Sequence, residues 1–145
     1  MGSSVFIGFE AILVAYDGSP QSQHALQLAL SLAKATSSKV LVFSVVEVPV
    51  PAPRAELNAI LDDGREGYER SFAAIRQQAG ENEIELETEI AVGNPADQII
   101  RRAETFQASL IVMGRREKSV VHHWIRGSSL ERVLRYVRCP VMLVR

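Results

Sequence analysis

The sequence has one cysteine, no long apolar run and almost no net charge, and each of these absences excludes a class of protein. Cys139 is the only cysteine in 145 residues, so no disulfide can form within the chain, which fits a reducing compartment. No stretch reaches the roughly 20 consecutive apolar residues that a membrane-spanning helix needs. A formal net charge of -1 gives no support for a nucleic-acid or anionic-membrane partner.

The short motifs of several enzyme classes are also missing. The chain has no G-x-S-x-G, no G-x-x-x-x-G-K-[ST], no G-x-G-x-x-G and no H-E-x-x-H. His122 and His123 are adjacent, and adjacent side chains rarely point the same way, while no further ligand stands at zinc spacing. We therefore expect no catalytic residue and no metal site, and a protein that is not an enzyme.

The first nine residues are predicted to form a flexible arm, and residues 10–145 a single domain. The length of 145 residues suits one domain of common size. The first residues lack the charged segment and the long apolar segment of a signal peptide. The expected location is therefore the cytoplasm.

Apolar runs alternate with amphipathic stretches along the domain. Continuous apolar runs at 11–16, 40–46 and 110–113 are typical of strands buried on both faces. Residues 84–92 alternate apolar and charged side chains, which predicts a strand at an edge, and residues 141–144 form a last strand. A strand-helix order repeated four times before a final strand predicts an α/β fold, with a parallel sheet covered by helices on both faces.

The helices have recognisable start signals. Ser19 can cap a helix that begins at Pro20, and Asn94-Pro95 starts another in the same way. The buried face of the first of these helices is predicted to comprise Ala25, Leu28, Ala29, Leu32 and Ala33.

A longer helix is expected from about residue 54 to residue 79. Its inner face is predicted from six apolar positions. In the helix that starts at Asn94-Pro95, the residues Ile99, Ile100 and Ala103 are predicted to face inward. Gly64 and Gly67 each cost a helix roughly 1 kcal/mol relative to alanine, so a break is expected around residues 62–67. The inner-face positions of the long helix are Leu57, Ile60, Leu61, Tyr68, Phe72 and Ile75.

The last third of the chain carries the elements of a phosphate site. A strand stops at Gly114, a basic loop follows, and Gly127 and Ser128 precede an amphipathic stretch. Glycine allows close approach of the backbone, and the free N–H groups of a helix N-terminus attract anions. Two structural alternatives remain open. Gly114 could simply make the turn, and Ser128 with Glu131 forms a capping box that any helix could use.

Several segments together resemble one known family. Ile12 to Ser19, Gly93-Asn94-Pro95-Ala96, and the run from Gly127-Ser128 to Cys139-Pro140-Val141 are similar to segments of the universal stress protein family. The resemblance extends from Ala11 to Arg145. It implies a doubly wound, five-stranded parallel sheet of order 3-2-1-4-5, of the adenine-nucleotide alpha-hydrolase-like or Rossmann-like type. It also implies a cytoplasmic, usually dimeric protein of the stress response.

One branch of that family binds ATP through the pattern G-x-x-G-x(9)-G-[ST]. Gly114 matches the first glycine and Gly127-Ser128 the last pair, but Glu117 replaces the second glycine. The implied cofactor is ATP or another adenine nucleotide, with Mg if ATP, and the carboxylate of Glu117 is expected to weaken triphosphate binding. The resemblance implies contacts from Ala15, Tyr16, Asp17, Val45, Met113, Gly114, Arg116, Glu117, Gly127, Ser128 and Ser129.

The function expected from this resemblance is a stress-response role through dimerisation and adenine-nucleotide binding. The dimer would form through the final strand, Val141–Val144, because an apolar edge strand needs a partner to cover it. Asp17 could contact adenosine or only its own turn. The alternatives are an interaction protein that binds no nucleotide and an ATP-cleaving enzyme, for which Glu117 is the acid nearest to Gly114.

Overall fold

Strand β1 (Ala11–Ala15) lies at the centre of a five-stranded parallel sheet. The computed structural model describes residues 8–49, 51, 54–115 and 127–145. The strand order is β3-β2-β1-β4-β5, so both the predicted α/β class and the predicted order are confirmed. The remaining elements are α1 (Pro20–Thr36), β2 (Lys39–Val46), α2 (Arg54–Glu81), β3 (Leu86–Val92), α3 (Pro95–Phe106), β4 (Leu110–Gly114), α4 (Gly127–Tyr136) and β5 (Val141–Val144).

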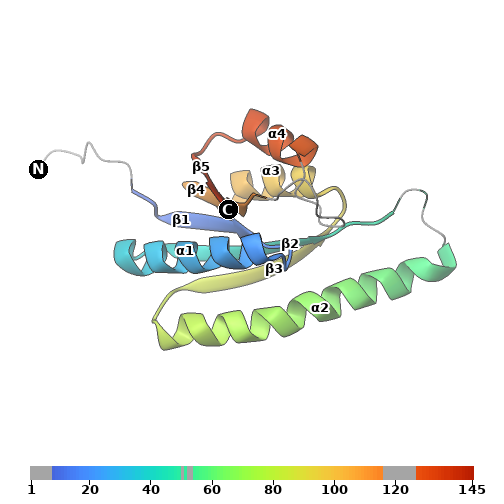
Figure 1. The fold of residues 1–145 in the computed structure, drawn as a ribbon, viewed down its shortest axis with the longest axis horizontal. Helices are drawn as coiled ribbons and strands as arrows, with labels where there is room; N and C mark the ends of the chain where they lie inside the picture. Colours follow the sequence, from blue (N-terminus) through green and yellow to red (C-terminus); the bar gives the residue numbers. More distant parts are fainter. Residues whose placement is uncertain (1–7, 50, 52–53, 116–126) are drawn as a thin grey trace, which may run out of the picture.

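The helices form one layer on each face of the sheet. Helices α1 and α2 cover one face, and α3 and α4 cover the other (Figure 1). Successive residues of β1 alternate between the two core layers: Leu13 packs toward α3 and α4, whereas Ile12 and Val14 pack toward α1 and α2. Because both faces are covered, β1 is buried along its whole length, as its continuous apolar run predicts.

Helix α1 begins as predicted but buries a different stripe of residues. The Oγ of Ser19 accepts a hydrogen bond from the N–H of Ser22 at 3.1 Å, and Pro20 is the first helical residue. Leu28 is 43% exposed and Leu32 only half-buried, so the predicted buried face is partly wrong. The buried side chains of α1 share one core layer with the sheet and with Phe72 and Ile75 of α2, and Leu28 lies outside that layer. The buried residues are Ser22, Ala25, Leu26, Ala29, Leu30 and Ala33.

Helix α2 is continuous over 28 residues, so the predicted break around residues 62–67 is wrong. A Cβ at Gly64 would lie 2.9 Å from Cγ1 of Val46, so the glycine lets the helix lie directly on β2. Packing gained by this close approach offsets the low helix propensity of glycine. The helix runs past the end of the sheet (Figure 1). Its buried residues, Phe72, Ile75 and Ala79, all lie in its second half.

The two edges of the sheet are β3 and β5, which confirms the edge position predicted for residues 84–92. Helix α3 starts at Pro95 with Asn94 as its N-cap, whose Oδ1 accepts from the N–H of Asp97 at 3.0 Å. Ile99 and Ala103 are buried as predicted. None of the helices in the described residues is long and apolar enough to cross a membrane.

The contact of Gly64 with Val46 generates a stability prediction with a matched control. Replacement of Gly67 by alanine should raise the free energy of unfolding by up to about 1 kcal/mol, because its Cβ would meet only the end of the Arg70 side chain at 3.9 Å. Gly64→Ala should instead lower it by about 1 kcal/mol, because both methyl groups of Val46 lie within 3.0 Å of the new Cβ.

Chemical denaturation of the two variants provides the measurement. In a double-mutant cycle, Val46→Ala should recover part of the loss at position 64 and leave Gly67→Ala unaffected. If Gly64→Ala were as stabilising as Gly67→Ala, α2 would not depend on this contact.

Candidate adenine-nucleotide site

The candidate site lies at the carboxyl ends of β1 and β4. These strands are neighbours, with Ala15 in register with Met113, but the helices that follow them cover opposite faces of the sheet. The strand order therefore reverses between them, and open α/β sheets bind ligands at such a point. Several of the implied residues are brought together here, namely Ala15, Tyr16, Asp17, Met113 and Gly114, with Val45 on the adjacent β2.

The turn after β1 is held by hydrogen bonds of its own residues. Oδ1 of Asp17 accepts from the N–H of Ser19 at 2.9 Å. The N–H of Asp17 donates to Oγ of Ser22 at 3.3 Å, and that hydroxyl donates to the carbonyl oxygen of Ser19 at 3.0 Å. Gly18 has a φ of 83°, a value that favours glycine. The sequence left two roles open for Asp17, and in this structure its carboxylate orders its own turn.

Gly114 has a role in packing that neither sequence interpretation included. A Cβ at this position would lie 2.5 Å from the carbonyl carbon of Gln21 and 2.6 Å from the nitrogen of Ser22. The first turn of α1 therefore lies directly against the last residue of β4. Gly114 does not have a positive φ, and the N–H of Arg115 continues the sheet by donating to the carbonyl oxygen of Val144 at 2.6 Å. The glycine is thus required by the helix rather than by a turn.

The apolar residues at the strand ends belong to the core. Ala15, Val45 and Met113 are at most 1% exposed and lie in the layer under α3 and α4. Tyr16 lies in the opposite layer, and its carbonyl oxygen accepts from the buried Oγ of Ser44 at 2.7 Å. The sequence did not indicate Ser44, because a serine in an apolar strand carries no motif. Its bond fixes the end of β1 against β2.

Helix α4 begins earlier than the capping box predicts. Its first residue is Gly127, so Ser128 lies within the first turn and not at the N-cap. Glycine and serine are both tolerated there, since the first N–H groups of a helix have no partner within the helix. The predicted contacts Arg116 and Glu117 lie outside the described residues, as do Lys118 and Arg126 of the basic loop and the side chain of Ser128.

One ion pair connects the middle of α4 to the start of α3. Nη2 of Arg132 lies 2.7 Å from Oδ1 of Asp97, in the first turn of α3. Among the described side chains of α4, Val133 is buried and Leu130 is half-buried, as is Val137 just after the helix. Both side chains of the pair are largely exposed, so it adds little to the packing of this short helix on α3. The described residues contain no group of three His, Cys, Asp or Glu side chains that could hold a metal ion.

Comparison with known proteins establishes the family. The family model described as "Universal stress protein family" matches residues 8–145. This chain belongs to the universal stress protein family. A universal stress protein of Thermus aquaticus is 34% identical to it over 142 residues, which is 94% of this chain and 99% of the relative. The resemblance inferred from the motifs is thereby confirmed.

Solved universal stress proteins share the fold. A structure from Burkholderia pseudomallei has a TM-score of 0.78 at 29% identity and covers 94% of this chain and 96% of its own. A universal stress protein solved in complex with cAMP has a TM-score of 0.62 at 25% identity and covers 95% of this chain and 98% of its own. The five-stranded sheet of this universal stress protein is therefore the arrangement found in its relatives.

The contact between Gly114 and α1 predicts that Gly114→Ala destabilises the protein even without a ligand. The new Cβ would meet two backbone atoms, so α1 must move, and overpacking of this kind costs about 1–3 kcal/mol. Chemical denaturation in the absence of nucleotide measures the loss.

Gly80→Ala is the control, because nothing lies within 4 Å of a Cβ at that position. It should leave stability unchanged or raise it slightly. A Gly114→Ala variant as stable as the wild type, but impaired only in nucleotide binding, would contradict the packing role.

Proposed function

We propose that this universal stress protein binds an adenine nucleotide between the carboxyl ends of β1 and β4 and acts through association rather than turnover. The observation that carries the proposal is the structural match to the universal stress protein solved with cAMP. The location of the site is supported by the reversal of strand order between β1 and β4, because the helices that follow these strands begin at the same end of the sheet on opposite faces.

The two ends of a nucleotide would meet different groups at this edge. The first N–H groups of α4, at Gly127, Ser128 and Ser129, lack partners within the helix and suit a phosphate. The ordered turn at Asp17 to Ser19 would face the nucleoside. The network of Ser19 and Ser22 holds that turn before any ligand arrives, so little ordering would remain for binding to accomplish. If the ligand is ATP, Mg would accompany it.

The proposal of a binding protein rests on the sequence, which lacks every nucleophile and phosphate-loop motif considered above. The competing enzyme would cleave ATP and would need a base or a metal ligand close to Gly114. The cytoplasm remains the proposed location, on the strength of the single cysteine.

Glu117 should make this protein discriminate poorly between ATP and AMP. A carboxylate about 4 Å from a phosphate charge costs roughly 1 kcal/mol in water and about 4 kcal/mol in a partly screened site. The nucleoside end of the ligand is unaffected, so the wild type should bind both nucleotides weakly, with little or no advantage for ATP. Glu117→Gly should strengthen ATP binding more than AMP binding, and the difference should shrink in high salt.

Titration calorimetry with two proteins and two nucleotides tests this directly. The control must remove one distant carboxylate without disturbing a helix. Glu131→Gly is unsuitable because Glu131 lies inside α4. Glu83→Gly is suitable because Glu83 is in a loop and has a φ of 55°, which glycine adopts readily. Wild-type binding of ATP at low micromolar concentration, unchanged by Glu117→Gly, would show that the side chain points away from the phosphates. Absence of binding of either nucleotide would reject the proposed function.

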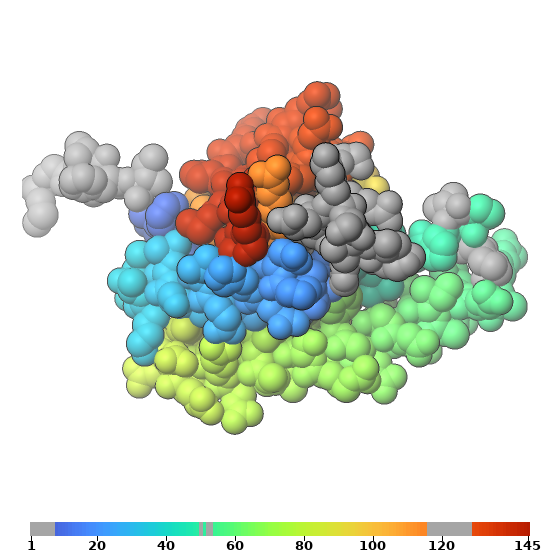
Figure 2. Space-filling view, viewed as in Figure 1, coloured from blue at the N-terminus to red at the C-terminus, as the bar shows by residue number. Residues whose placement is uncertain are grey.

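We also propose that two copies associate through β5. The two sheet edges differ in chemistry: β3 carries Glu87 and Glu89, whereas β5 exposes Met142 and Leu143 at 38% and 37%. Charges on an edge strand oppose pairing with another sheet, and an apolar edge favours it. The end of β5 lies against α1 (Figure 2). Nδ1 of His24 on that helix is 2.8 Å from the carbonyl oxygen of Arg145.

Helices on both faces of the sheet carry an exposed leucine. Leu28 stands one turn after His24 and therefore lies on the side of α1 that faces β5, and it is 43% exposed. Leu134 of α4 is 47% exposed on the other face. A second copy related by a two-fold axis would pair β5 with β5 and cover the same patch on both copies.

Leu143→Lys should therefore convert a dimer to a monomer, because it places two like charges at the two-fold contact. Size exclusion with light scattering gives the mass. Glu87→Lys, at the opposite edge, is the control and should leave the mass unchanged. A wild-type protein that is soluble and monomeric at micromolar concentration would reject the β5 interface.

A further inference from the structure

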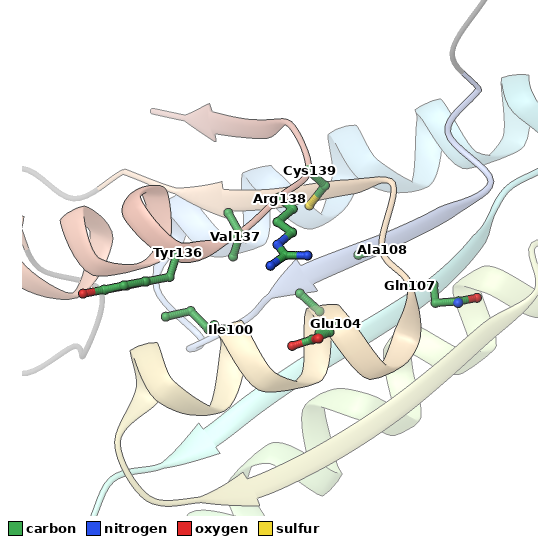
Figure 3. A pocket seen from close by; sticks show the side chains of 9 residues that line it. Ile100, Glu104, Gln107, Ala108, Tyr136, Val137, Arg138 and Cys139 are labelled. Carbon is green, nitrogen blue, oxygen red and sulfur yellow. The ribbon is translucent and has the colours of Figure 1, made fainter.

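A cavity of about 210 Å³ lies between α3 and α4, far from the proposed nucleotide site. One wall comes from the last two turns of α3 and the other from the end of α4 and the link to β5 (Figure 3). Ala108 and Cys139 line it just before β4 and β5 begin. The cavity is therefore at the amino ends of these strands, whereas the nucleotide site is at their carboxyl ends.

The cavity is partly open to solvent, and its floor is mostly apolar. Ala103 is 6% exposed, and Ile100, Val137 and Cys139 are half-buried around it. A cavity of about 150 Å³ lined by apolar groups suffices to hold a benzene molecule. The space left by two small residues, Ala103 and Ala108, can thus take a branched aliphatic or a single-ring group.

Two opposite charges stand on the two walls. Arg138 extends from the link between α4 and β5 toward α3, where Glu104 lies (Figure 3). Both side chains are exposed, and both line the same cavity. The ion pairs found in the described residues do not include a pair between Arg138 and Glu104. An anion alone would meet repulsion from Glu104, and a cation alone would meet repulsion from Arg138. A molecule that carries both charges a short distance apart matches both.

We propose that this cavity binds a free amino acid with an apolar side chain. Arg138 would hold the carboxylate, since its planar guanidinium suits bidentate pairing with that group. Glu104 would accept hydrogen bonds from the ammonium group. The side chain would enter the apolar interior against Ala103 and Val137, where its burial supplies most of the affinity. Leucine, isoleucine and valine fit the volume, and a two-ring side chain such as tryptophan is too large.

Cys139 offers a reporter for occupancy, because it is the only cysteine of the chain and lines the cavity. Burial raises the pKa of its thiol, so alkylation by a maleimide should be followed at mildly alkaline pH, where enough thiolate is present. L-leucine should slow alkylation in a saturable manner, and the concentration at half effect should agree with the dissociation constant from calorimetry. No slowing and no heat with any apolar amino acid would overturn the proposal.

Charge variants separate a zwitterion site from an apolar cavity. Arg138→Gln and Glu104→Gln, both at exposed positions, should each weaken leucine binding by about tenfold or more. Arg135→Gln, on the exposed face of α4 and outside the cavity lining, should change nothing. Isocaproate, which lacks the ammonium group, and isoamylamine, which lacks the carboxylate, should bind more weakly than leucine. Equal binding of all three compounds, insensitive to both substitutions, would mean that the charges play no part.

Discussion

The contact between the first turn of α1 and the last residue of β4 is the constraint on which the carboxyl edge of the sheet depends. Gly114 has room for a hydrogen and nothing larger, because backbone atoms of Gln21 and Ser22 occupy the space of a Cβ. Both residues lie in the first turn of α1, and Ser22 is hydrogen-bonded to Asp17 and Ser19 in the turn after β1. One close approach therefore ties the end of β4 to the turn after β1, and these two segments border the proposed nucleotide site.

The elements with strong local signals could be predicted from the sequence. Continuous apolar runs marked the buried strands, the alternating charges of residues 84–92 marked an edge, and Ser19-Pro20 and Asn94-Pro95 marked two helix starts. These features depend on the residues themselves and their immediate neighbours. The motifs from Ile12 to Val141 gave the family, and the strand order followed from that resemblance.

Features that depend on contacts between distant segments could not be predicted. The low helix propensity of glycine predicts a break of α2 near Gly64. The structure keeps the helix continuous because the glycine allows close packing on Val46 of β2. The role of Gly114 likewise depends on a helix that precedes it by some 90 residues of chain. The core position of Val45 and Met113, on the α3 and α4 side, also depends on distant segments, and matching a family pattern says nothing of such surroundings. Leu28 was assigned to the interior because helical periodicity does not decide which of two adjacent apolar stripes of α1 faces the core.

The two ends of the sheet offer different chemistry, and we propose a nucleotide at only one of them. Helix N-termini gather at the carboxyl ends, while the amino ends of β4 and β5 hold an apolar cavity with Arg138 and Glu104 on its walls. A titration of isotope-labelled protein with AMP, followed residue by residue by amide chemical shifts, compares the two ends in one experiment. Saturable shifts are expected at Asp17 to Ser19, Gly114 and Gly127 to Ser129, and none at Ala103 or Cys139. Shifts confined to the cavity, or no saturable shift at the carboxyl ends of β1 and β4, would contradict the proposed nucleotide site.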